Sequence, residues 1–462
     1  MKSIRLNIED IFNLPSAVIY NPDDLKPVSH ITIDSRSVKK KSLFIAIKGK
    51  KHDGHNFVRE VVSKSASAVL INADKYRSYN DLRVPIITVE NTTKALGSIA
   101  NIWRRKLSTK IIGITGSSGK TTTKDMLATI LVEKYKVNKT YSNNNNHIGV
   151  PLTILSTTNK HEVLVAELGT NHFNEIKYSA GILEPGYAMI LNIGDAHVEY
   201  LKNRAGVWKE KSALFYETLK NNGKIFINYD DPVTKRFVGK SKNLVTYGFS
   251  GRTDLKAKVK KYSADGKPVI EIKYKNKKFT EKLNFYGEQS ANNYIAAVAA
   301  AFELGLSKSQ ILSGTKKIKA TPQRLNVIHN KNFVLIDDTY NANPDSTKAA
   351  IELVGKISLF DKKILILGDM LELGKSKIEL HKRLSLVIRK NKIDELYAIG
   401  PAMKHLNESL KVKGIIKKHF RTRKSLMNFI TKKDFNNSVI LVKGSRGMCM
   451  EEFVIAIKNS NC

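Results

Sequence analysis

The sequence predicts an α/β protein of three domains: a small mixed α/β domain over residues 1–88, a central domain over 89–320 that joins a P-loop and a parallel sheet to a small antiparallel meander, and a Rossmann-like domain over 321–462. The length of 462 residues predicts this number at roughly 150 residues per domain. Strand-like and helical segments alternate along most of the chain, which is typical of sheets with parallel strands.

Short elements of both kinds fill the first 88 residues. Apolar or alternating stretches predict strands at 31–34, 43–47, 68–71 and 86–89, and a helical pattern covers 57–65. Together they predict a compact α/β module.

The central domain begins with a strand, a glycine-rich turn and a helix. A helix predicted over 91–107 leads to a buried strand at 110–115 and then to a helix over 120–135. Further strands are predicted at 163–166 and 188–193. This order predicts a doubly wound parallel sheet.

Residues 254–285 have a different pattern. Apolar and polar residues alternate over 269–274, after the turn signal Asp265-Gly266, and lysine is abundant. We therefore expect an exposed antiparallel meander, followed by an alanine-rich helix over 292–306.

From about Thr321 the alternation of strands and helices resumes. Strands are predicted near 334–337, 364–367, 395–399 and 439–442, with amphipathic helices between them. This pattern predicts a second Rossmann-like domain.

The net charge is strongly positive. Lys and Arg number 78 and Asp and Glu 42, which gives +36, although charged residues make up an ordinary 26%. Such an excess attracts nucleic acid, anionic lipid or phosphorylated metabolites, and it does not choose among them.

The two cysteines, Cys449 and Cys462, form neither a disulfide framework nor a zinc-ligand spacing, which is typical of a reducing compartment. Charged residues interrupt the N-terminal segment where a signal peptide needs an apolar core, and no apolar run approaches the roughly 18 residues of a membrane span. We expect a cytoplasmic protein without membrane insertion.

The strongest motif is GITGSSGKT, residues 113–121. Its glycines allow backbone N–H groups to face phosphate oxygens, Lys120 can neutralise the terminal phosphates, and the Thr121 hydroxyl can bind Mg²⁺. Ile114 stands where the common P-loop pattern has glycine. The strand before and the helix after the motif favour nucleotide binding over a plain turn.

Three further side chains are candidates on weaker local evidence. Glu167 and His197 each follow a predicted parallel strand, at the sheet edge where ligands bind, but an isolated residue of either type is often structural. Lys211 on its own looks like one more solvated helix lysine.

Polar loops follow three strands of the last domain. They are DTYNANP at 338–344, Gly368-Asp369, and KGSR at 443–446, whose Arg446 can hold a carboxylate bidentately. Three such loops at one sheet edge suggest a shared pocket.

Taken together, the motifs resemble those of the Mur ligases of peptidoglycan synthesis, along essentially the whole chain. The matching motifs are DSR at 34–36, DGHNF at 53–57, GITGSSGKTTTK at 113–124, NNNNHIGVPLTIL at 143–155, AELGTNH at 166–172, NIGDAHVEYL at 192–201, DDTYNANPDS at 337–346, GDMLELG at 368–374 and KGSRGMCMEE at 443–452. The similarity is greatest to the members that add D-alanyl-D-alanine.

The resemblance implies a UDP-sugar-binding domain, an ATP-binding domain and a C-terminal ligase domain. It implies that ATP phosphorylates the terminal carboxylate of UDP-MurNAc-tripeptide and that the amine of D-Ala-D-Ala attacks the acyl phosphate, giving the pentapeptide. ATP and two Mg²⁺ ions are the implied cofactors, and a monomer that does not bind nucleic acid is expected.

Site residues are likewise implied by the resemblance. Catalysis would rest on Lys120, Glu167, His197 and Lys211. Contacts to ATP would come from Gly113, Thr115, Gly116, Ser117, Ser118, Gly119, Lys120, Thr121, Thr122, Asn293, Arg324, Asp338 and Asn341. The UDP-sugar and peptide substrates would be bound by Ser35, Arg36, Asn145, Asn146, Asn343 and Arg446. Metal ligands would be Thr121, Glu167, His197 and Lys211, the last as a carbamate, because CO₂ converts a neutral amine into an anionic oxygen ligand.

The chain departs from the family pattern at three places. It has Gln289-Ser290 where histidine or tyrosine and then asparagine are frequent, Ala213 where glutamate is frequent, and Ser142 where glycine is frequent.

Two other functions are considered. The sister ligase that adds the third amino acid shares the first two domains, but YNANP argues against it. A basic P-loop protein that binds nucleic acid would need basic clusters with stacking aromatics, whereas here lysines are spread over all three domains and aromatics make up 8%.

Overall fold

The computed structural model describes residue 4 and residues 6–459. Part of the charged N-terminal segment and Cys462, on which two of the sequence predictions depend, lie outside the described residues. The chain forms two compact units. The first contains the residues up to Gly113 with Tyr135–Thr170 and Glu175–Tyr187, and the second contains Ile114–Lys134, Asn171–Asn174 and the chain from Ala188 onward.

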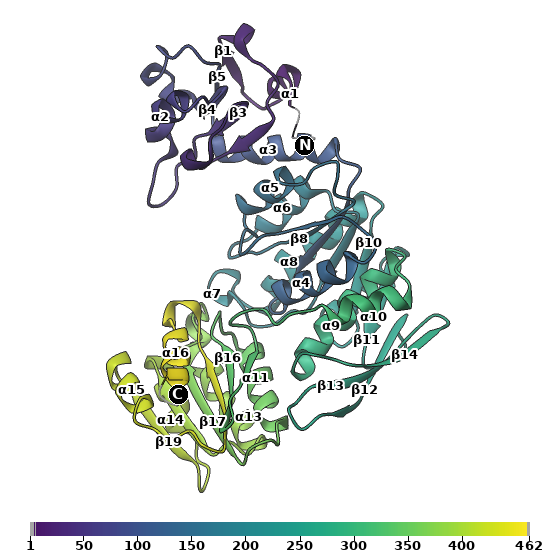
Figure 1. Ribbon diagram of the computed structural model, residues 1–462, viewed down its shortest axis with the longest axis vertical. Helices are drawn as coiled ribbons and strands as arrows, with labels where there is room; N and C mark the ends of the chain where they lie inside the picture. The colour runs from purple at the N-terminus through teal and green to yellow at the C-terminus, as the bar shows by residue number, and fades with distance from the viewer. Residues whose placement is uncertain (1–3, 5, 460–462) are drawn as a thin grey trace. The chain divides into compact units, whose positions relative to one another are not determined.

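Each of the three predicted α/β regions contains one sheet, which confirms the predicted fold class (Figure 1). The N-terminal sheet has the order β1-β5-β4-β3-β2, with only β1 antiparallel to its neighbour. Its strands are β1 (Val18–Tyr20), β2 (His30–Thr32), β3 (Ser42–Ile45), β4 (Ala68–Asn72) and β5 (Ile86–Val89). Phe44, Val69 and Ile71 pack with Val58 and Val61 of helix α2 (Val58–Ser63) to form its core.

The central sheet has nine strands in the order β14-β13-β12-β11-β10-β9-β6-β8-β7. They are β6 (Lys110–Thr115), β7 (Val137–Lys139), β8 (Val163–Glu167), β9 (Tyr187–Ile190), β10 (Lys224–Asn228), β11 (Leu244–Gly248), β12 (Leu255–Tyr262), β13 (Pro268–Tyr274) and β14 (Lys277–Lys282). The helices of this region are α3 (Thr92–Arg105), α4 (Lys120–Leu131), α5 (Gly149–Leu155), α6 (Glu175–Leu183), α7 (Val198–Leu201), α8 (Arg204–Lys220), α9 (Gly287–Glu303) and α10 (Lys308–Lys316).

The meander is present as β12, β13 and β14, which pair antiparallel. The expectation that it is exposed is wrong for one face. Ile270, Ile272 and Tyr274 of β13 are buried, and the Tyr274 ring stacks on Phe302 of α9 with the ring centroids 4.9 Å apart. Because β11 pairs parallel with β12, the meander also continues the main sheet instead of standing apart from it.

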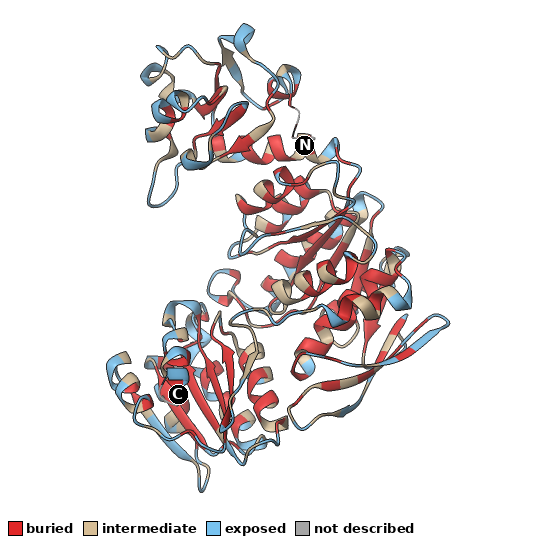
Figure 2. Ribbon diagram, in the orientation of Figure 1, coloured by how far each residue is buried: buried red, intermediate tan, exposed pale blue. Residues whose placement is uncertain are grey.

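The C-terminal sheet has the order β15-β16-β20-β17-β18-β19, parallel except for β15. Its strands are β15 (Asn326–His329), β16 (Phe333–Asp338), β17 (Lys362–Gly368), β18 (Glu395–Ile399), β19 (Ile416–Phe420) and β20 (Ser438–Lys443). The connecting helices are α11 (Pro344–Lys356), α12 (Lys377–Lys382), α13 (Leu384–Lys390), α14 (Pro401–Ser409), α15 (Arg423–Ile430) and α16 (Glu451–Asn459). Strands β16 and β20 are buried at every position, and β17 is buried from Ile364 onward (Figure 2).

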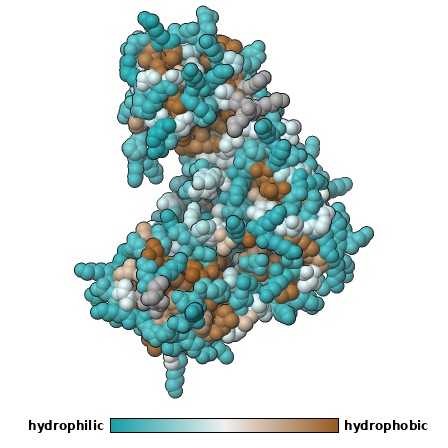
Figure 3. Space-filling model, viewed as in Figure 1, coloured by the Kyte–Doolittle hydropathy of each residue, from teal (hydrophilic) through white to brown (hydrophobic). Residues whose placement is uncertain are grey.

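The strand order has a direct consequence for the site. Strands β16, β20 and β17 are neighbours and parallel, so the three polar loops that follow them lie at one edge of the sheet. Hydrophilic side chains cover most of the molecular face seen in Figure 3. Over the described part of the chain, no helix has both the length and the apolar character of a membrane span.

Candidate active site

The phosphate loop connects β6 to α4, as the motif predicts. Gly119 has φ +80°, and a Cβ there would lie 2.3 Å from Oδ1 of Asn293, so only glycine fits. The Lys120 ammonium folds back over the loop and donates to the carbonyl of Gly116 at 2.8 Å. The loop therefore has the compact form that places N–H groups and a cation beside a phosphate chain.

Asn192, which follows β9, holds the loop from its far side. Its backbone carbonyl accepts the N–H of Ser117 at 3.1 Å, and its side-chain Oδ1 accepts the N–H of Ser118 at 2.9 Å. The Ser117 hydroxyl accepts the N–H of Gly194 at 2.8 Å. These bonds couple the phosphate loop to the neighbouring loop 192–197.

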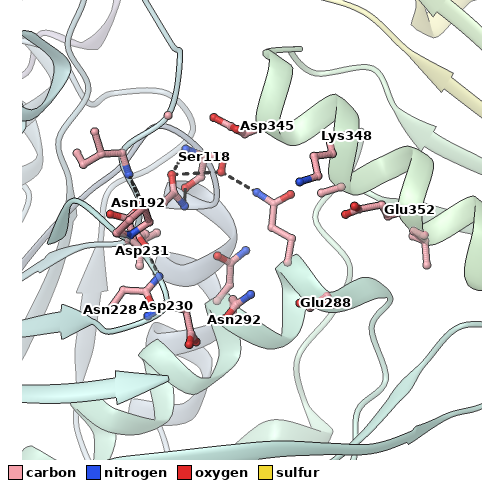
Figure 4. Close-up of a pocket in the computed structure, with 18 of the residues that line it drawn as sticks. Ser118, Asn192, Asn228, Asp230, Asp231, Glu288, Asn292, Asp345, Lys348 and Glu352 are labelled. Carbon is pink, nitrogen blue, oxygen red and sulfur yellow. Dashed lines mark hydrogen bonds between the residues drawn. The ribbon is translucent and has the colours of Figure 1, made fainter. Parts of the chain in front are cut away.

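A cavity of about 370 Å³ opens beside Ser118 of the phosphate loop (Figure 4). Its walls come from loops after β9 and β10, from the start of α9, and from α11. The polar side chains that line it include Ser118, Asn192, Asp230, Asp231, Gln289, Asn292, Asn293, Asp345, Lys348 and Glu352. Its volume and position fit a nucleoside whose phosphates lie on the loop.

Two buried polar atoms of this cavity have no hydrogen-bond partner: the Tyr247 hydroxyl and Oδ1 of Asn292. Buried polar groups are normally paired, so these atoms are suited to a polar ligand. Burial and the nearby carboxylates of Asp231 and Asp230 raise the pKa of Tyr247, which keeps it a neutral hydroxyl. Sequence motifs do not indicate Tyr247 or Asn292. Sequence reasoning also missed Asn228, Asp230 and Asp231 of the same cavity, for which the strand-end sequence Asn228-Tyr229-Asp230-Asp231 offered a signal.

Gln289 occupies the first of the positions where the sequence departs from the family pattern. Its Nε2 donates to Oγ of Ser118 at 2.7 Å, so α9 is tied directly to the phosphate loop. Ser142, where the family often has glycine, has φ +51° and thus adopts the left-handed conformation that glycine favours.

Helix α11 contacts the loops after β6 and β9 through its first turn. Asn343 caps the helix and donates from Nδ2 to the carbonyl of Ser117 at 3.2 Å. Oδ2 of Asp345 accepts the N–H of Asp195 at 3.2 Å, and Oδ1 lies 3.8 Å from Arg204, which also pairs with Asp195 at 2.7 Å. The helix is thereby fixed across the cavity.

The three polar loops at the edge of the C-terminal sheet meet, as the sequence predicts. Lys443 donates to Asp338 at 2.5 Å and to the carbonyl of Asn341 at 2.9 Å, and Oγ of Ser445 donates to the carbonyl of Ala342 at 3.1 Å. Ser445 Oγ in turn accepts the N–H of Leu371 at 2.8 Å.

Arg324 and Arg446 lie beside these loops. The Arg324 guanidinium lies over the ring of Tyr340 at 3.9 Å from its centroid, and Arg446 donates to Gln323 at 3.1 Å. Asp338 also accepts the N–H of Leu325 at 3.1 Å, so it fixes the backbone next to Arg324.

His197 and Lys211 both belong to the second unit. Nδ1 of His197 lies 2.6 Å from Oε2 of Glu372. Burial lowers the pKa of His197, the hydrogen bond with Glu372 opposes that shift, and the positive charges of Lys120 and Lys211 add to it. Lys211 is fully buried in α8, so the plain interpretation as a solvated helix lysine is wrong.

Glu167 belongs to the first unit and is 2% exposed. It accepts a hydrogen bond from Nδ2 of Asn145 at 2.9 Å, and its N–H donates to Oγ1 of Thr140 at 2.9 Å. Oδ1 of Asn146 accepts the N–H of Gly149, the first residue of α5, at 2.8 Å. The asparagine run thus has a defined structure around the carboxylate.

The side chains of the candidate site can be compared with the ligands that a metal ion prefers. Within the described ranges no three His, Cys, Asp or Glu side chains come together as a metal site. Mg²⁺ commonly keeps waters and binds one or two protein oxygens together with substrate phosphates, and the Thr121 hydroxyl and Glu167 carboxylate are donors of that kind. The shared site predicted for these ligands stays a prediction.

Ser35 and Arg36 lie in a short 3₁₀ helix that Asp34 caps. Arg36 forms a bidentate pair with Asp34 at 2.9 and 2.8 Å, which lowers the pKa of Asp34 to about 2. Apart from this pair, the Arg36 side chain is largely exposed.

Comparison with known proteins places these features in a family. The Mur ligase middle domain matches residues 114–301, the Mur ligase glutamate ligase domain 323–446, and the Mur ligase family catalytic domain 27–104. A UDP-N-acetylmuramoyl-tripeptide–D-alanyl-D-alanine ligase of Bacillus subtilis is 32% identical over 98% of each chain, and the Escherichia coli ligase of that description is 30% identical over 94% of each.

Solved structures agree. MurF from Acinetobacter baumannii superposes with a TM-score of 0.88 at 29% identity, covering 99% of this chain and 100% of the other. MurF from Thermotoga maritima in complex with ADP gives 0.81 at 28% identity, covering 93% and 97%. By its sequence over nearly the whole length, and by its fold, the chain belongs to the Mur ligase family.

Proposed function

We propose that the chain is an ATP-dependent ligase that adds D-alanyl-D-alanine to UDP-MurNAc-tripeptide. The observation that carries this function is the full-length similarity to ligases of that description, at 30% to 34% identity over more than nine-tenths of the chain for several of them. The cavity beside the phosphate loop supports it, because the reaction consumes ATP.

The reaction has two steps. The terminal carboxylate of the tripeptide attacks the γ-phosphorus of ATP, the bond to the β-phosphate oxygen breaks, and ADP leaves. The free amine of D-Ala-D-Ala then attacks the acyl phosphate carbon, a tetrahedral intermediate forms, and the carbon–oxygen bond to phosphate breaks as the amine loses a proton. The products are the amide, ADP and inorganic phosphate.

Lys120 and the phosphate loop supply the electrostatic part of catalysis. Charge accumulates on the transferring phosphoryl group and on the departing phosphate, and a preorganised cation and N–H groups stabilise it. The cavity holds the nucleoside between α9 and α11, with Asn293 at its wall. Arg324, Asp338 and Asn341 complete the nucleotide site from the C-terminal domain.

Two Mg²⁺ ions are proposed as cofactors, and when bound they would offset phosphate charge. Thr121, Glu167 and His197 are the proposed ligands. Lys211 is proposed as a carbamate: full burial makes an ammonium costly there, and the carbamate would replace it with an anionic oxygen donor.

The remaining site residues are proposed for the other substrates. Ser35 and Arg36 would meet the uridine diphosphate end, Asn145 and Asn146 the peptide end, and Asn343 with Arg446 the incoming dipeptide. Because ATP and UDP-sugar precursors are cytoplasmic metabolites, we expect the enzyme to work there, as a monomer.

Phosphate release from ATP tests the function. The wild-type chain should release phosphate only with both UDP-MurNAc-tripeptide and D-Ala-D-Ala present, and Lys120→Ala should abolish the release. Lys258→Glu, an exposed charge reversal in the meander, is the matched control and should keep turnover.

Phosphate release that does not depend on either substrate and rises with added RNA would refute the proposed ligase function. Assays with meso-diaminopimelate and L-lysine tripeptides, run side by side, identify the third residue that the enzyme accepts.

A further inference from the structure

Residues 368–374, GDMLELG, follow β17 and have no role in the function proposed above. The loop is held at nearly every position. Oδ1 of Asp369 accepts the N–H of Met403 at 2.8 Å at the start of α14, and the N–H of Met370 donates to Nε2 of buried His381 at 3.0 Å. Together with the bond from Leu371 to Ser445, these contacts make the loop a rigid support.

The loop contacts residues 197–199 at three points. The Glu372 carboxylate meets Nδ1 of His197 at 2.6 Å, and the Glu372 carbonyl accepts the N–H of Glu199 at 3.2 Å. Gly374, with φ +52°, lies so close that a Cβ would come within 3.2 Å of Cα of Glu199. Contacts made by both backbone and side chain fix how the two loops meet.

His197 and Glu372 both adopt left-handed backbone conformations, with φ of 55° and 61°. Such conformations are uncommon for residues other than glycine, asparagine, aspartate and histidine, and they persist where the surroundings impose them. Both residues of the hydrogen-bonded pair have this conformation. Their orientation is therefore built into both loops.

The hydrogen bond with Glu372 fixes which ring nitrogen of His197 carries hydrogen. An ionised carboxylate only accepts hydrogen bonds, so Nδ1, 2.6 Å from Oε2 of Glu372, is the nitrogen that donates. Nε2 is then the ring nitrogen that can present a lone pair. Carboxylate–histidine pairs of this kind fix the ring that presents a nitrogen to a metal or to a substrate.

We propose that Glu372 is a positioning residue: it fixes the tautomer and the ring orientation of His197, and through it the C-terminal domain completes the catalytic centre. The proposal rests on the ligase function and deepens it, because it assigns a role to the GDMLELG loop. Glu372 need not touch a substrate, since it acts through His197.

Glu372→Ala, Glu372→Gln and a control, Glu379→Ala, test the proposal. Glu379 lies in α12 on the same segment, is exposed and forms an ion pair with Arg383 at 3.1 Å. Glu372→Ala should lower kcat by about 10- to 100-fold and shift the Mg²⁺ dependence, while KM for ATP changes by less than about threefold. Glu372→Gln keeps an acceptor oxygen and should lose much less, and the control should match the wild type.

¹⁵N NMR of the histidine rings in the full chain gives a readout that does not need turnover, with His197→Gln used for assignment. The wild type and Glu372→Gln should show His197 with hydrogen on Nδ1, and Glu372→Ala should show a mixture of tautomers. An unchanged tautomer in Glu372→Ala, or a kcat equal to that of the control, would overturn the proposal. If wild-type turnover does not depend on D-Ala-D-Ala, the proposed ligase function is wrong. The NMR tautomer of His197 in Glu372→Ala still decides whether Glu372 positions that ring.

Discussion

Replacing Gly194 by alanine is expected to weaken ATP binding by displacing Asp345 from its place at the start of α11. A Cβ at residue 194 would lie 1.8 Å from Oδ2 of Asp345, which is far inside van der Waals contact. Because this oxygen ends a flexible side chain, the carboxylate can swing away without unfolding the loop. Gly194→Ala and Asp345→Ala should therefore have the same effect, because both remove the contacts by which the Asp345 carboxylate holds α11 across the cavity.

The size of the effect follows from the two interactions lost. The hydrogen bond from the N–H of Asp195, at 3.2 Å, contributes about 1 kcal/mol. The ion pair with Arg204, at 3.8 Å and with both side chains nearly half exposed, adds at most about 0.5 kcal/mol. A loss of about 1.5 kcal/mol corresponds to a roughly tenfold rise in KM for ATP.

Most of this contact is the hydrogen bond from Asp195, which does not need a charged acceptor. Burial raises the pKa of Asp345 above its ordinary value. The contribution of this carboxyl group to the free energy of unfolding is therefore greatest at low pH, and it declines as the pH rises through the folded-state pKa. Asp345→Asn keeps an acceptor oxygen without the charge, and its KM for ATP should stay within about twofold of the wild type.

Initial rates of phosphate release at saturating peptide substrates measure KM for each variant, and thermal unfolding controls for folding. In Gly194→Ala/Asp345→Ala the added methyl group meets no carboxylate, so the double variant should be no worse than either single one. A roughly hundredfold rise in the double variant, or no effect of Gly194→Ala alone, would refute the reasoning.

Two further predictions concern the terminal domains. The carboxyl of Asp34 should titrate near pH 2 by ¹³C NMR, and Arg36→Ala should return its pKa toward the ordinary value. Because the folded-state pKa is lowered, the stabilising effect of the Asp34–Arg36 pair is present above the ordinary aspartate pKa and is lost as the pH falls toward 2. Phe453→Ala should cost about 3–5 kcal/mol and lower the unfolding temperature of the C-terminal domain, whereas Ile455→Ala, 56% exposed on the same helix, should have little effect.

The sequence predicts most of the buried strands, but it misses the interior strands β10 and β11 and several edge strands. Strand β16 is buried at every position, so its apolar run is unmistakable. In β19 the first three residues are exposed and two are lysines, and β7 has only three residues. Edge strands of this kind show neither an apolar run nor a clear alternation, and the pattern misses them. The prediction that β13 is exposed was wrong for a related reason: abundant lysines on one face of the meander hid the alternating apolar residues of the other face.

The candidate site divides in the same way. Local motifs indicate the phosphate loop and the strand-end loops, because their chemistry lies in consecutive residues. The pairs that join them do not follow from any local pattern: Asp345 meets Asp195 across 150 residues, His197 meets Glu372 across 175, and Lys443 meets Asp338 across 105. Strand order brings Lys443 to Asp338, because β16 and β20 are neighbours in one sheet, whereas the other two pairs join segments that follow strands of different sheets.

Exposed lysines on the outer strands of two sheets affect whether two copies of this protein can pair edge to edge. The outer strand β14 of the nine-stranded sheet carries exposed Lys277, Lys278 and Lys282, and the outer strand β19 carries exposed Lys417 and Lys418. An outer strand offers unpaired N–H and C=O groups to any similar strand, and like charges on both partners oppose that pairing. These five lysines thus oppose edge-to-edge aggregation of the open sheets, and salt weakens this protection by screening their charges.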